Sequence, residues 1–433
     1  MKAMQNNQEK ITVDYTDNYP RWKDEYKSTY KILIPDMLPW HFAIIEQLLK
    51  MEGYDVVILK NDSRAVIDEG LKHVHNDTCY PCLCVVGQYI DALKSGKYDV
   101  KHTAVMISQS GGGCRASNYV ALIRKALKAQ FPDVPVVSLN FSGLERDSSF
   151  KIGLKLLLKL AFGIFYGDSI MWCYNQTKPY EEQPGAADIA RDAAMNTVIE
   201  SYRSGSYFRY KKINAQIIST FAAVRRSDVK KVKVGVVGEI YVKYSYLGNN
   251  HLEQFLLDED CEPVVPALMD FALYCIVNNI NDSDLYGKKG IFYTANRLLY
   301  RVLYRMQKNI IKQYKADGTF EPIHDFEHLR QCADKVINQG VKMGEGWLIP
   351  AEMAALAETG TENIVCAQPF GCLPNHIAGK GTIRTLKNMY EHENIVAVDY
   401  DPSATKVNQE NRIKLMLANA RENLNGSGHG AHR

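Results

Sequence analysis

The sequence predicts an α/β protein with two doubly wound, Rossmann- or flavodoxin-like parallel-sheet domains and a helical segment between or beside them. Short runs rich in β-branched residues alternate with helix-like stretches in the early and the late part of the chain. Residues 150–230 between them contain no strand-like run and have the pattern of helices. A chain of 433 residues is also too long for a single compact core, which favours two or three domains.

The first α/β domain is expected over residues 1–150, with strands at 30–36 (YKILIPD), 54–60 (YDVVILK), 102–110 (HTAVMISQS) and 134–140 (VPVVSLN). Helix-like segments such as WHFAIIEQLLKMEG and ASNYVALIRKALKAQF separate these runs. A helical segment follows over 151–230. The second α/β domain, 231–420, has strand-like runs at 231–240, 261–269, 361–370 and 394–401, and a helical insertion, RLLYRVLYRMQKNIIKQY. The small, polar residues 421–433 are expected to form a disordered tail.

Composition indicates a soluble protein, with 46% hydrophobic and 23% charged residues. The net charge of +3 gives no reason to expect nucleic acid or an anionic membrane as a partner. The one long apolar stretch, residues 151–172, carries lysines at four-residue spacing (Lys151, Lys155 and Lys159), so it is predicted to be a packed amphipathic helix and not a membrane span.

The N-terminal residues lack an apolar core, so no export signal is expected and the predicted location is the cytoplasm. Ten cysteines would stay reduced there, and clustered cysteines then indicate metal or redox chemistry more than disulfides.

Three cysteines, Cys79, Cys82 and Cys84, lie within six positions in the stretch NDTCYPCLCVVGQ. Asp77 and Thr78 are suitable N-cap residues, and Pro81 suits the first turn of a helix. Cys79 and Cys82 are therefore predicted at a helix N-terminus, where backbone N–H groups and the helix dipole favour thiolate over thiol.

Two further cysteines occupy similar positions. Cys114 follows a strand and the glycines 111–113, which let the backbone approach a ligand closely, and it opens a helix-like segment. SGGGCR is not a Walker motif, so a phosphate loop is disfavoured. Cys372 follows the strand-like run NIVCAQPF. We expect Cys79, Cys114 and Cys372 just beyond strand ends, where open α/β sheets bind ligands.

The remaining cysteines are expected to be mainly structural. Cys275 is predicted to lie in the core, and Cys173, Cys261 and Cys332 have no clustered partner. Cys82, Cys84 and Cys366 are intermediate, since Cys84 could pack within its helix and Cys366 lies inside a strand. The C-x2-C-x-C spacing lacks the second close pair of a zinc ribbon. Thiolates gathered from distant strand ends suit an iron–sulfur cluster better.

HDFEH (324–328) fits the H-x-x-E-H pattern, with His324 and His328 one helical turn apart and Glu327 beside them. Five-residue matches arise easily by chance, so a solvated helix start after Pro322 is the default interpretation and a peptidase site the alternative.

Five stretches resemble the 2-hydroxyacyl-CoA dehydratase component superfamily: NDTCYPC…VVGQYIDALKSGKYD, SQSGGGCRASNY, GEIYVKYSYLGNNHLEQFL, CAQPFGCLPNHIAGKG and VDYDPSATKVNQENRIKLML. Within it the chain is most similar to double-cubane cluster proteins and to related activase-fused proteins, from about residue 30 to 420. The chain has no ATPase segment, so it resembles the stand-alone cluster subunit.

This resemblance implies a cofactor and a partner. Dehydratase subunits hold a four-iron four-sulfur cluster on three cysteines, which correspond here to Cys79, Cys114 and Cys372. Double-cubane proteins hold an eight-iron nine-sulfur cluster that needs about six cysteines, and Cys82, Cys84 and Cys366 are the candidates for the other three. Cys173 or Cys332 could replace one of these. A separate dimeric iron–sulfur activator that hydrolyses ATP would supply low-potential electrons, and the resemblance implies a homodimer.

Polar residues beside the cysteine turns are candidate proton or hydrogen-bond donors: Gln109, Ser110 and His376, as candidate catalytic residues, with Lys380, Glu239, Lys243 and Asn249. Loop capping or solvation is the alternative for each of them.

The first expected function is a reductase that uses electrons from the activator to reduce a small-molecule substrate at a double-cubane cluster. The second is an (R)-2-hydroxyacyl-CoA dehydratase-type subunit with one four-iron cluster, and the third a non-catalytic iron–sulfur carrier or assembly protein. The extra cysteines favour the first, and the chain shows no strong basic cluster for a CoA pocket.

Overall fold

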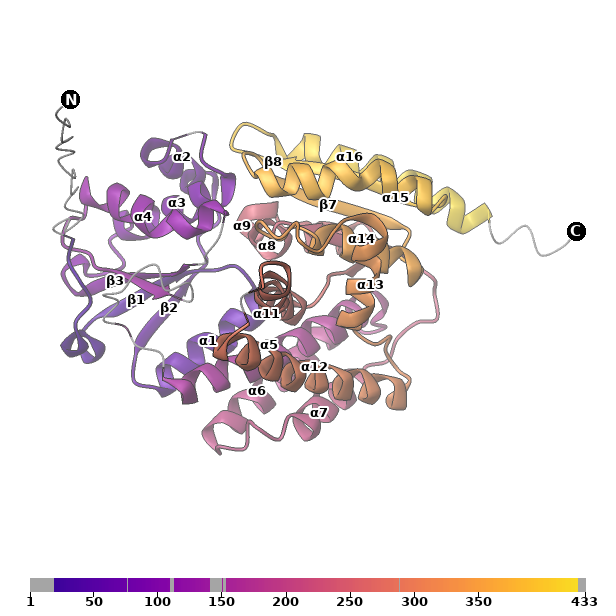
Figure 1. The fold of residues 1–433 in the computed structure, drawn as a ribbon, viewed down its shortest axis with the longest axis horizontal. Helices are drawn as coiled ribbons and strands as arrows, with labels where there is room; N and C mark the ends of the chain where they lie inside the picture. Colours follow the sequence, from indigo (N-terminus) through magenta and orange to yellow (C-terminus); the bar gives the residue numbers. More distant parts are fainter. Residues whose placement is uncertain are drawn as a thin grey trace, which may run out of the picture.

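The chain forms two four-stranded sheets surrounded by helices in the computed structural model, which describes residues 19–75, 77–109, 113–140, 150, 153–287 and 289–426 (Figure 1). The strands are β1 (Lys31–Pro35), β2 (Asp55–Leu59), β3 (Thr103–Gln109), β4 (Val136–Asn140), β5 (Val232–Gly238), β6 (Cys261–Val264), β7 (Asn363–Pro369) and β8 (Asn394–Tyr400). Each lies in a run from which the sequence predicts it, and the predicted fold class is confirmed.

The α-helices are α1 (Pro39–Met51), α2 (Arg64–His73), α3 (Tyr80–Lys94), α4 (Tyr119–Lys128), α5 (Leu154–Asn175), α6 (Ala186–Arg203), α7 (Tyr210–Ala222), α8 (Ile240–Tyr244), α9 (Tyr246–Asn249), α10 (Leu252–Asp258), α11 (Leu268–Leu285), α12 (Ile291–Asp317), α13 (Phe326–Val336), α14 (Leu348–Glu358), α15 (Ile383–Met389) and α16 (Lys406–Gly426). Short helical turns are η1 (Asp24–Ser28), η2 (Val100–His102), η3 (Arg115–Asn118), η4 (Lys178–Tyr180), η5 (Asn375–Gly379) and η6 (Lys380–Thr382).

The two sheets have the same topology. Their orders are β2-β1-β3-β4 and β6-β5-β7-β8, and all neighbouring strands are parallel. The direction of winding reverses between β1 and β3 in the first sheet and between β5 and β7 in the second. The carboxyl ends of these strand pairs are the positions where doubly wound sheets place ligands.

Both faces of each sheet are covered, as the continuous apolar strands require. In the first sheet, Leu33 and Val105 pack into the hydrophobic cluster of α3 and α4, while Ile32 and Met106 face the cluster that includes Leu49 of α1. Figure 1 shows this sheet with α2, α3 and α4 on one side and α1 on the other.

The two sheets share one core. The cluster that contains the buried side chains of α3 also contains residues of β5, β7, α8 and α16, and α3 packs against α9. Polar contacts join the domains as well, since Arg64 donates to the carbonyl oxygen of Pro402 at 2.7 Å and His251 pairs with Asp62 at 2.9 Å. The cysteine-bearing turns are thereby held in fixed positions relative to one another.

The segment after the first sheet and the insertion in the second half form a single helical body. Helices α5, α6, α7, α11 and α12 contact one another, and their apolar side chains join those of α13 and α14 in a second large cluster. Residues 153–230 contain no strand in the described part, as expected; Glu181 and Arg226 form an isolated β-bridge.

Helix α5 is the one helix among the described residues that is long and apolar enough to cross a membrane, by length and composition alone. Of its most apolar window, 61% is buried inside the protein. It packs against α1, α6, α7 and α11, as the core helix of a soluble protein does. Lys155 is exposed, while Lys151 of the expected lysine stripe lies outside the described residues.

The second domain extends past the boundary expected at residue 420. Helix α16 continues to Gly426, so residues 421–426 do not belong to a disordered tail. Its inner face, with Met416 and Leu417, is buried, and Arg421 donates to the carbonyl oxygen of Glu259 at 2.5 Å. Residues 427–433 lie outside the described residues.

Candidate metal centre

Three cysteine-bearing turns meet at the carboxyl ends of the two sheets. Cys114 is the N-cap of η3 after β3, Cys372 follows β7, and Cys79 is the N-cap of α3. The backbone N–H of Tyr80 donates to the carbonyl oxygen of Phe370 at 3.0 Å, which joins α3 of the first domain to the turn after β7 in the second. The turns of Cys79 and Cys372 are thus in direct contact.

Gly371 makes this contact possible. Its φ is +76°, and an added Cβ would lie 3.2 Å from the Cα of Cys79. A third loop, which contains Met343 and Gly344, packs against the other turns. A Cβ on Gly113, beside Cys114, would meet the sulfur of Met343 at 2.4 Å, and a Cβ on Gly344 would lie 3.2 Å from Pro374, beside Cys372. Glycine at these positions lets three backbone segments approach closely.

Two expectations about Cys79 are wrong in detail. The N-cap of α3 is Cys79 itself, and Asp77 and Thr78 precede it. Cys79 also does not follow a strand directly, because α2 lies between β2 and α3. It reaches the strand ends because α3 packs against the second domain. Pro81 does lie in the first turn of α3, as predicted.

Burial raises the pKa of all three thiols, to about 12 for Cys114. A backbone N–H group opposes this effect at each sulfur: that of Cys82 at Cys79, that of Ala116 at Cys114 (3.5 Å) and that of Asn375 at Cys372. The expected preference for thiolate is therefore wrong for the protein alone, since desolvation outweighs the helix N-terminus. The positive charge of a bound metal would favour ionised thiols here.

The electrostatic contacts place these thiols in one group. Burial is the main cause of the raised pKa of Cys114, and the charges of Glu239 and Cys79 raise this pKa further. In the same way, the charge of Cys114 raises the pKa of Cys372. The hydroxyl of Tyr119 lies 3.0 Å from Cys79 Sγ in a hydrogen bond. Three thiols from separate turns, each with an N–H donor, suit the ligand set of an iron–sulfur cluster.

Two carboxyl groups lie beside the thiols at the N-terminus of α8. Glu239 follows β5, caps α8 and accepts from the N–H of Val242 at 2.9 Å, while Glu345 accepts from the N–H of Ile240 at 3.1 Å. Burial raises the pKa of both, and the charge of Glu345 raises that of Glu239 further. Both charges also add to the raised pKa of Cys114 and Cys372.

Glu345 is a residue of the centre that the sequence does not predict. Its signal is the stretch GEGW, in which Gly344 (φ +58°) and Gly346 (φ +37°) flank a single acid just before a helix. Such glycines allow a tight turn, but the turn's position over the thiols depends on contacts between distant segments.

Cys275 was predicted to lie in the core, and this is wrong. The neighbouring Tyr274 is buried instead, and its hydroxyl donates to the carbonyl oxygens of Lys342 and Gly344. Cys275 faces outward and is exposed. Desolvation by surrounding protein and, after it, the charge of Glu345 raise the pKa of its thiol to about 12.

The three additional candidate ligands divide into two groups. Cys82 and Cys84 are fully buried in α3, and the charge of Cys79 adds to the raised pKa of each, after burial. Cys366 lies on the other face of β7, where the side-chain amide of Gln368 approaches its sulfur at 3.6 Å and a Cβ on Gly379 would lie 3.3 Å away. The structure brings Cys82 and Cys84 close to Cys79, and Cys366 is directed into a different core.

The polar candidates have mostly structural partners. Gln109 donates to the carbonyl oxygen of Ser117 at 2.8 Å and so braces the Cys114 turn. His376 is half-buried, and its backbone N–H donates to the carbonyl oxygen of Cys372 at 3.2 Å. Lys243 forms a buried ion pair with Glu352 at 2.9 Å. Ser110 lies outside the described residues.

Two of the other candidates also stabilise local structure. The Asn249 side chain donates to the carbonyl oxygen of Val242 at 2.9 Å, and Lys380 lies 3.5 Å from Asp399. Glu239 is the polar candidate that lies close to the thiols. The turn between β5 and α8 therefore contributes a carboxyl group to the centre.

The H-x-x-E-H interpretation of residues 324–328 is wrong. His324 precedes the N-cap Asp325 of α13, so it is not on the helix that carries His328. Glu327 contacts Tyr300 and Arg330 and does not stand beside both imidazoles. The default interpretation, a helix start after Pro322, holds.

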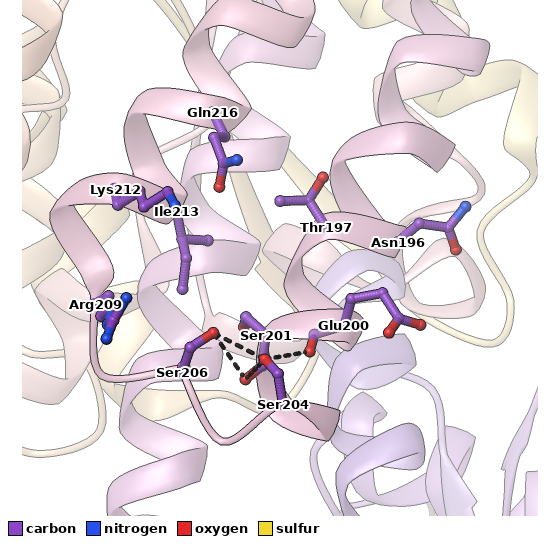
Figure 2. A pocket seen from close by; sticks show the side chains of 10 residues that line it. All are labelled: Asn196, Thr197, Glu200, Ser201, Ser204, Ser206, Arg209, Lys212, Ile213 and Gln216. Atoms are coloured by element: carbon purple, nitrogen blue, oxygen red, sulfur yellow. Dashed lines mark hydrogen bonds between the residues drawn. The ribbon is translucent and has the colours of Figure 1, made fainter.

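A separate surface pocket of about 500 Å³ lies between α6 and α7 (Figure 2). Its lining is mostly polar: Asn196, Thr197, Glu200, Ser201, Ser204, Ser206, Arg209, Lys212, Ile213 and Gln216. Ser204 bonds to the carbonyl oxygens of Glu200 and Ser201 and to Ser206. The pocket contains none of the cysteines.

Fold and site together define a doubly wound α/β protein with a cysteine-rich centre at the junction of its two sheets. No protein-family model matches the chain, and no curated protein matches it either.

Proposed function

We propose that the chain is the iron–sulfur component of a reductase, with its cluster on Cys79, Cys114 and Cys372. The observation that carries the proposal is the meeting of three cysteine-bearing turns from two domains, two of which the Tyr80–Phe370 hydrogen bond joins directly. Such a cluster, when bound, supplies one-electron chemistry at a potential that its surroundings set. We further propose that electrons come from a separate ATP-hydrolysing iron–sulfur activator.

The chain's own groups have two tasks in this function. The N–H groups of Cys82, Ala116 and Asn375 hydrogen-bond to the ligand sulfurs, which stabilises a more reduced cluster. The hydroxyl of Tyr119 does the same at Cys79. Glu239 and Glu345, whose raised pKa values keep them protonated at higher pH than ordinary carboxyl groups, can hold a proton for a substrate bound at the centre.

A dehydratase-type subunit with one four-iron cluster is the second candidate. The observation in its favour is the position of Cys366 on the opposite face of β7, which disfavours this thiol as one of about six ligands of a double cubane. The proximity of Cys82 and Cys84 to Cys79 supports the double-cubane form in turn. The two candidates share the three-cysteine set and differ in iron content and substrate.

The test is anaerobic purification followed by measurement of iron and acid-labile sulfide per chain. About four irons would support a single cubane, and about eight a double one. Replacing Cys114 with Ser should remove the cluster, while Cys173→Ser, a buried thiol bonded to Tyr314 in the helical body, should leave it in place. Zinc alone in the purified protein, or full iron in the Cys114 variant, would overturn the proposal.

Activity separates the remaining candidates. A reductase should consume electrons and ATP in proportion to a reduced small-molecule product. A dehydratase should need only priming amounts of electrons and eliminate water from a 2-hydroxyacyl-CoA. Retention of the cluster without turnover of either kind would indicate a carrier.

A further inference from the structure

Three metal-ligating side chains of different kinds meet where α13 packs against α14. His328 and Cys332 stand four residues apart on α13, and Glu358 is the last residue of α14. Cys332 Sγ lies 3.7 Å from His328 Nε2 and 3.7 Å from Glu358 Oε2, and His328 Nε2 lies 3.4 Å from Glu358 Oε2. The three donor atoms form a nearly equilateral triangle.

This spacing is that of ligands around one small ion. Zinc binds sulfur at about 2.3 Å, imidazole nitrogen at about 2.0–2.1 Å and carboxylate oxygen at about 2.0–2.2 Å, so tetrahedral angles place the donor atoms about 3.4–3.6 Å apart. The nitrogen–oxygen distance is longer than an ordinary hydrogen bond, about 2.7–3.2 Å. The two sulfur contacts at 3.7 Å are weak hydrogen bonds of the Cys332 thiol, which coordination of an ion by the thiolate would replace.

The surroundings direct one oxygen of Glu358 to the triangle. Its other oxygen, Oε1, accepts from the hydroxyl of Tyr390 at 2.6 Å and from the ammonium group of Lys335. Oε2 alone faces Cys332 and His328. Partners outside the ligand set that orient the ligands are a regular feature of built metal sites.

We propose that His328 Nε2, Cys332 Sγ and Glu358 Oε2 bind one zinc-class divalent cation, with water in the fourth position. Nitrogen, sulfur and oxygen donors together suit a borderline-soft ion such as Zn²⁺. Cys332 is buried while His328 and Glu358 reach the surface, so an ion can enter from solvent. The thiolate and the carboxylate balance the ion's two positive charges.

The bound cation would join the middle of α13 to the end of α14. Helix α14 leads directly into β7, the strand that ends at the Cys372 turn, and the two helices already pack against each other. The ion's role is therefore structural, because it would anchor the outer helix α13 to the helix that precedes a strand of the second sheet.

The test is zinc binding by the full chain, measured by competition with a chromophoric chelator, and the absorption of the cobalt-loaded protein. We expect one equivalent of zinc that is weakened at least about tenfold in His328→Gln. A sulfur-to-cobalt charge-transfer band should disappear in Cys332→Ala. Cys173→Ala removes a buried thiol elsewhere in the helical body and should change neither measurement.

Zinc could also bind the thiols of the cysteine centre, so the variants must separate the two places. If His328→Gln loses the bound zinc and Cys114→Ser retains it, the zinc belongs to the site on α13 and α14. Zinc binding that His328→Gln and Glu358→Gln leave unchanged overturns the proposal. His328 and Glu358 reach the surface, so these two variants keep the test valid if Cys332→Ala does not fold. Zinc should also raise the melting temperature of the wild type more than that of His328→Gln.

Discussion

The backbone nitrogen of Tyr80 donates a hydrogen bond to the carbonyl oxygen of Phe370 at 3.0 Å, although Tyr80 belongs to the first α/β domain and Phe370 to the second. Each is close in sequence to a candidate ligand, Cys79 on one side and Cys372 on the other. The bond therefore fixes the separation of two thiols from two domains. A cluster bound here would depend on the junction of the domains as much as on the cysteines.

Gly371→Ala should weaken this junction. The backbone at Gly371 has φ +76°, and the added Cβ would lie 3.2 Å from the Cα of Cys79. The left-handed conformation alone costs about 1–2 kcal/mol for a residue with a Cβ. We expect Gly371→Ala to lower the free energy of unfolding by more than this and to reduce the iron bound per chain, measured by denaturant unfolding and by iron assay.

Gly318→Ala is the matched control. Gly318 has φ +73° at the end of α12, and nothing lies within 4 Å of the position of its Cβ. It should show the conformational cost without the loss of iron. Equal iron content in the two variants would contradict the importance of the Gly371 contact.

Much of the fold could be predicted because parallel strands covered on both faces are continuous β-branched runs, such as DVVIL in β2. The contacts between the domains could not be predicted, because no local sequence pattern shows which turn of one domain contacts which turn of the other. Cys275 shows the same limit within one helix: Tyr274 and Cys275 are adjacent, and only tertiary packing decides which is buried. Glu345 reaches the centre on a loop that contacts the other turns through Met343 and Gly344.

Cys366→Ala and Cys372→Ala should differ in their effect on iron. The two cysteines are close in sequence, but Cys366 is buried inside β7 toward Gln368, and Cys372 lies in the turn beyond the strand. We expect the Cys372 variant to lose the cluster and the Cys366 variant to keep it, with a loss of stability on the order of 1 kcal/mol from the cavity. Loss of half the iron in Cys366→Ala would instead support a double cubane that includes this thiol.

Lys243→Met should destabilise the protein strongly. Lys243 and Glu352 are both buried and lie 2.9 Å apart, so removing the cation leaves a buried carboxylate without its partner. Breaking such a pair typically costs about 3–5 kcal/mol, whereas replacing both partners with apolar residues is often neutral. Chemical denaturation should therefore show the double variant Lys243→Met/Glu352→Met to be more stable than the single one.

The same pair gives a dependence on pH. Burial raises the pKa of Glu352 even with Lys243 present. In Lys243→Met the carboxyl group can become protonated as the pH falls, which relieves the unpaired charge. The destabilisation measured at pH 5 should be smaller than at pH 8. An equal loss at both values would show that Glu352 is not the source of the effect.

Glu253→Gln should remove part of the pH dependence of stability. Glu253 is buried on α10, and burial raises its pKa from 4.5 to about 7, opposed by a hydrogen bond from Asn175 at 3.1 Å. Between these pH values the folded protein keeps a proton that the unfolded chain releases. This contribution to stability is therefore complete below pH 4.5 and is lost as the pH rises toward 7.

The expected loss from Glu253 is on the order of 3 kcal/mol between pH 4.5 and pH 8, since one unit of pKa corresponds to about 1.4 kcal/mol. Glutamine retains an oxygen that can accept from Asn175 and does not titrate, so its variant should show a flatter stability profile over this range in urea titrations. Glu200→Gln, on the surface beside Arg203, should leave the profile unchanged. A wild-type slope that persists in Glu253→Gln would assign the pH dependence to another buried carboxyl group.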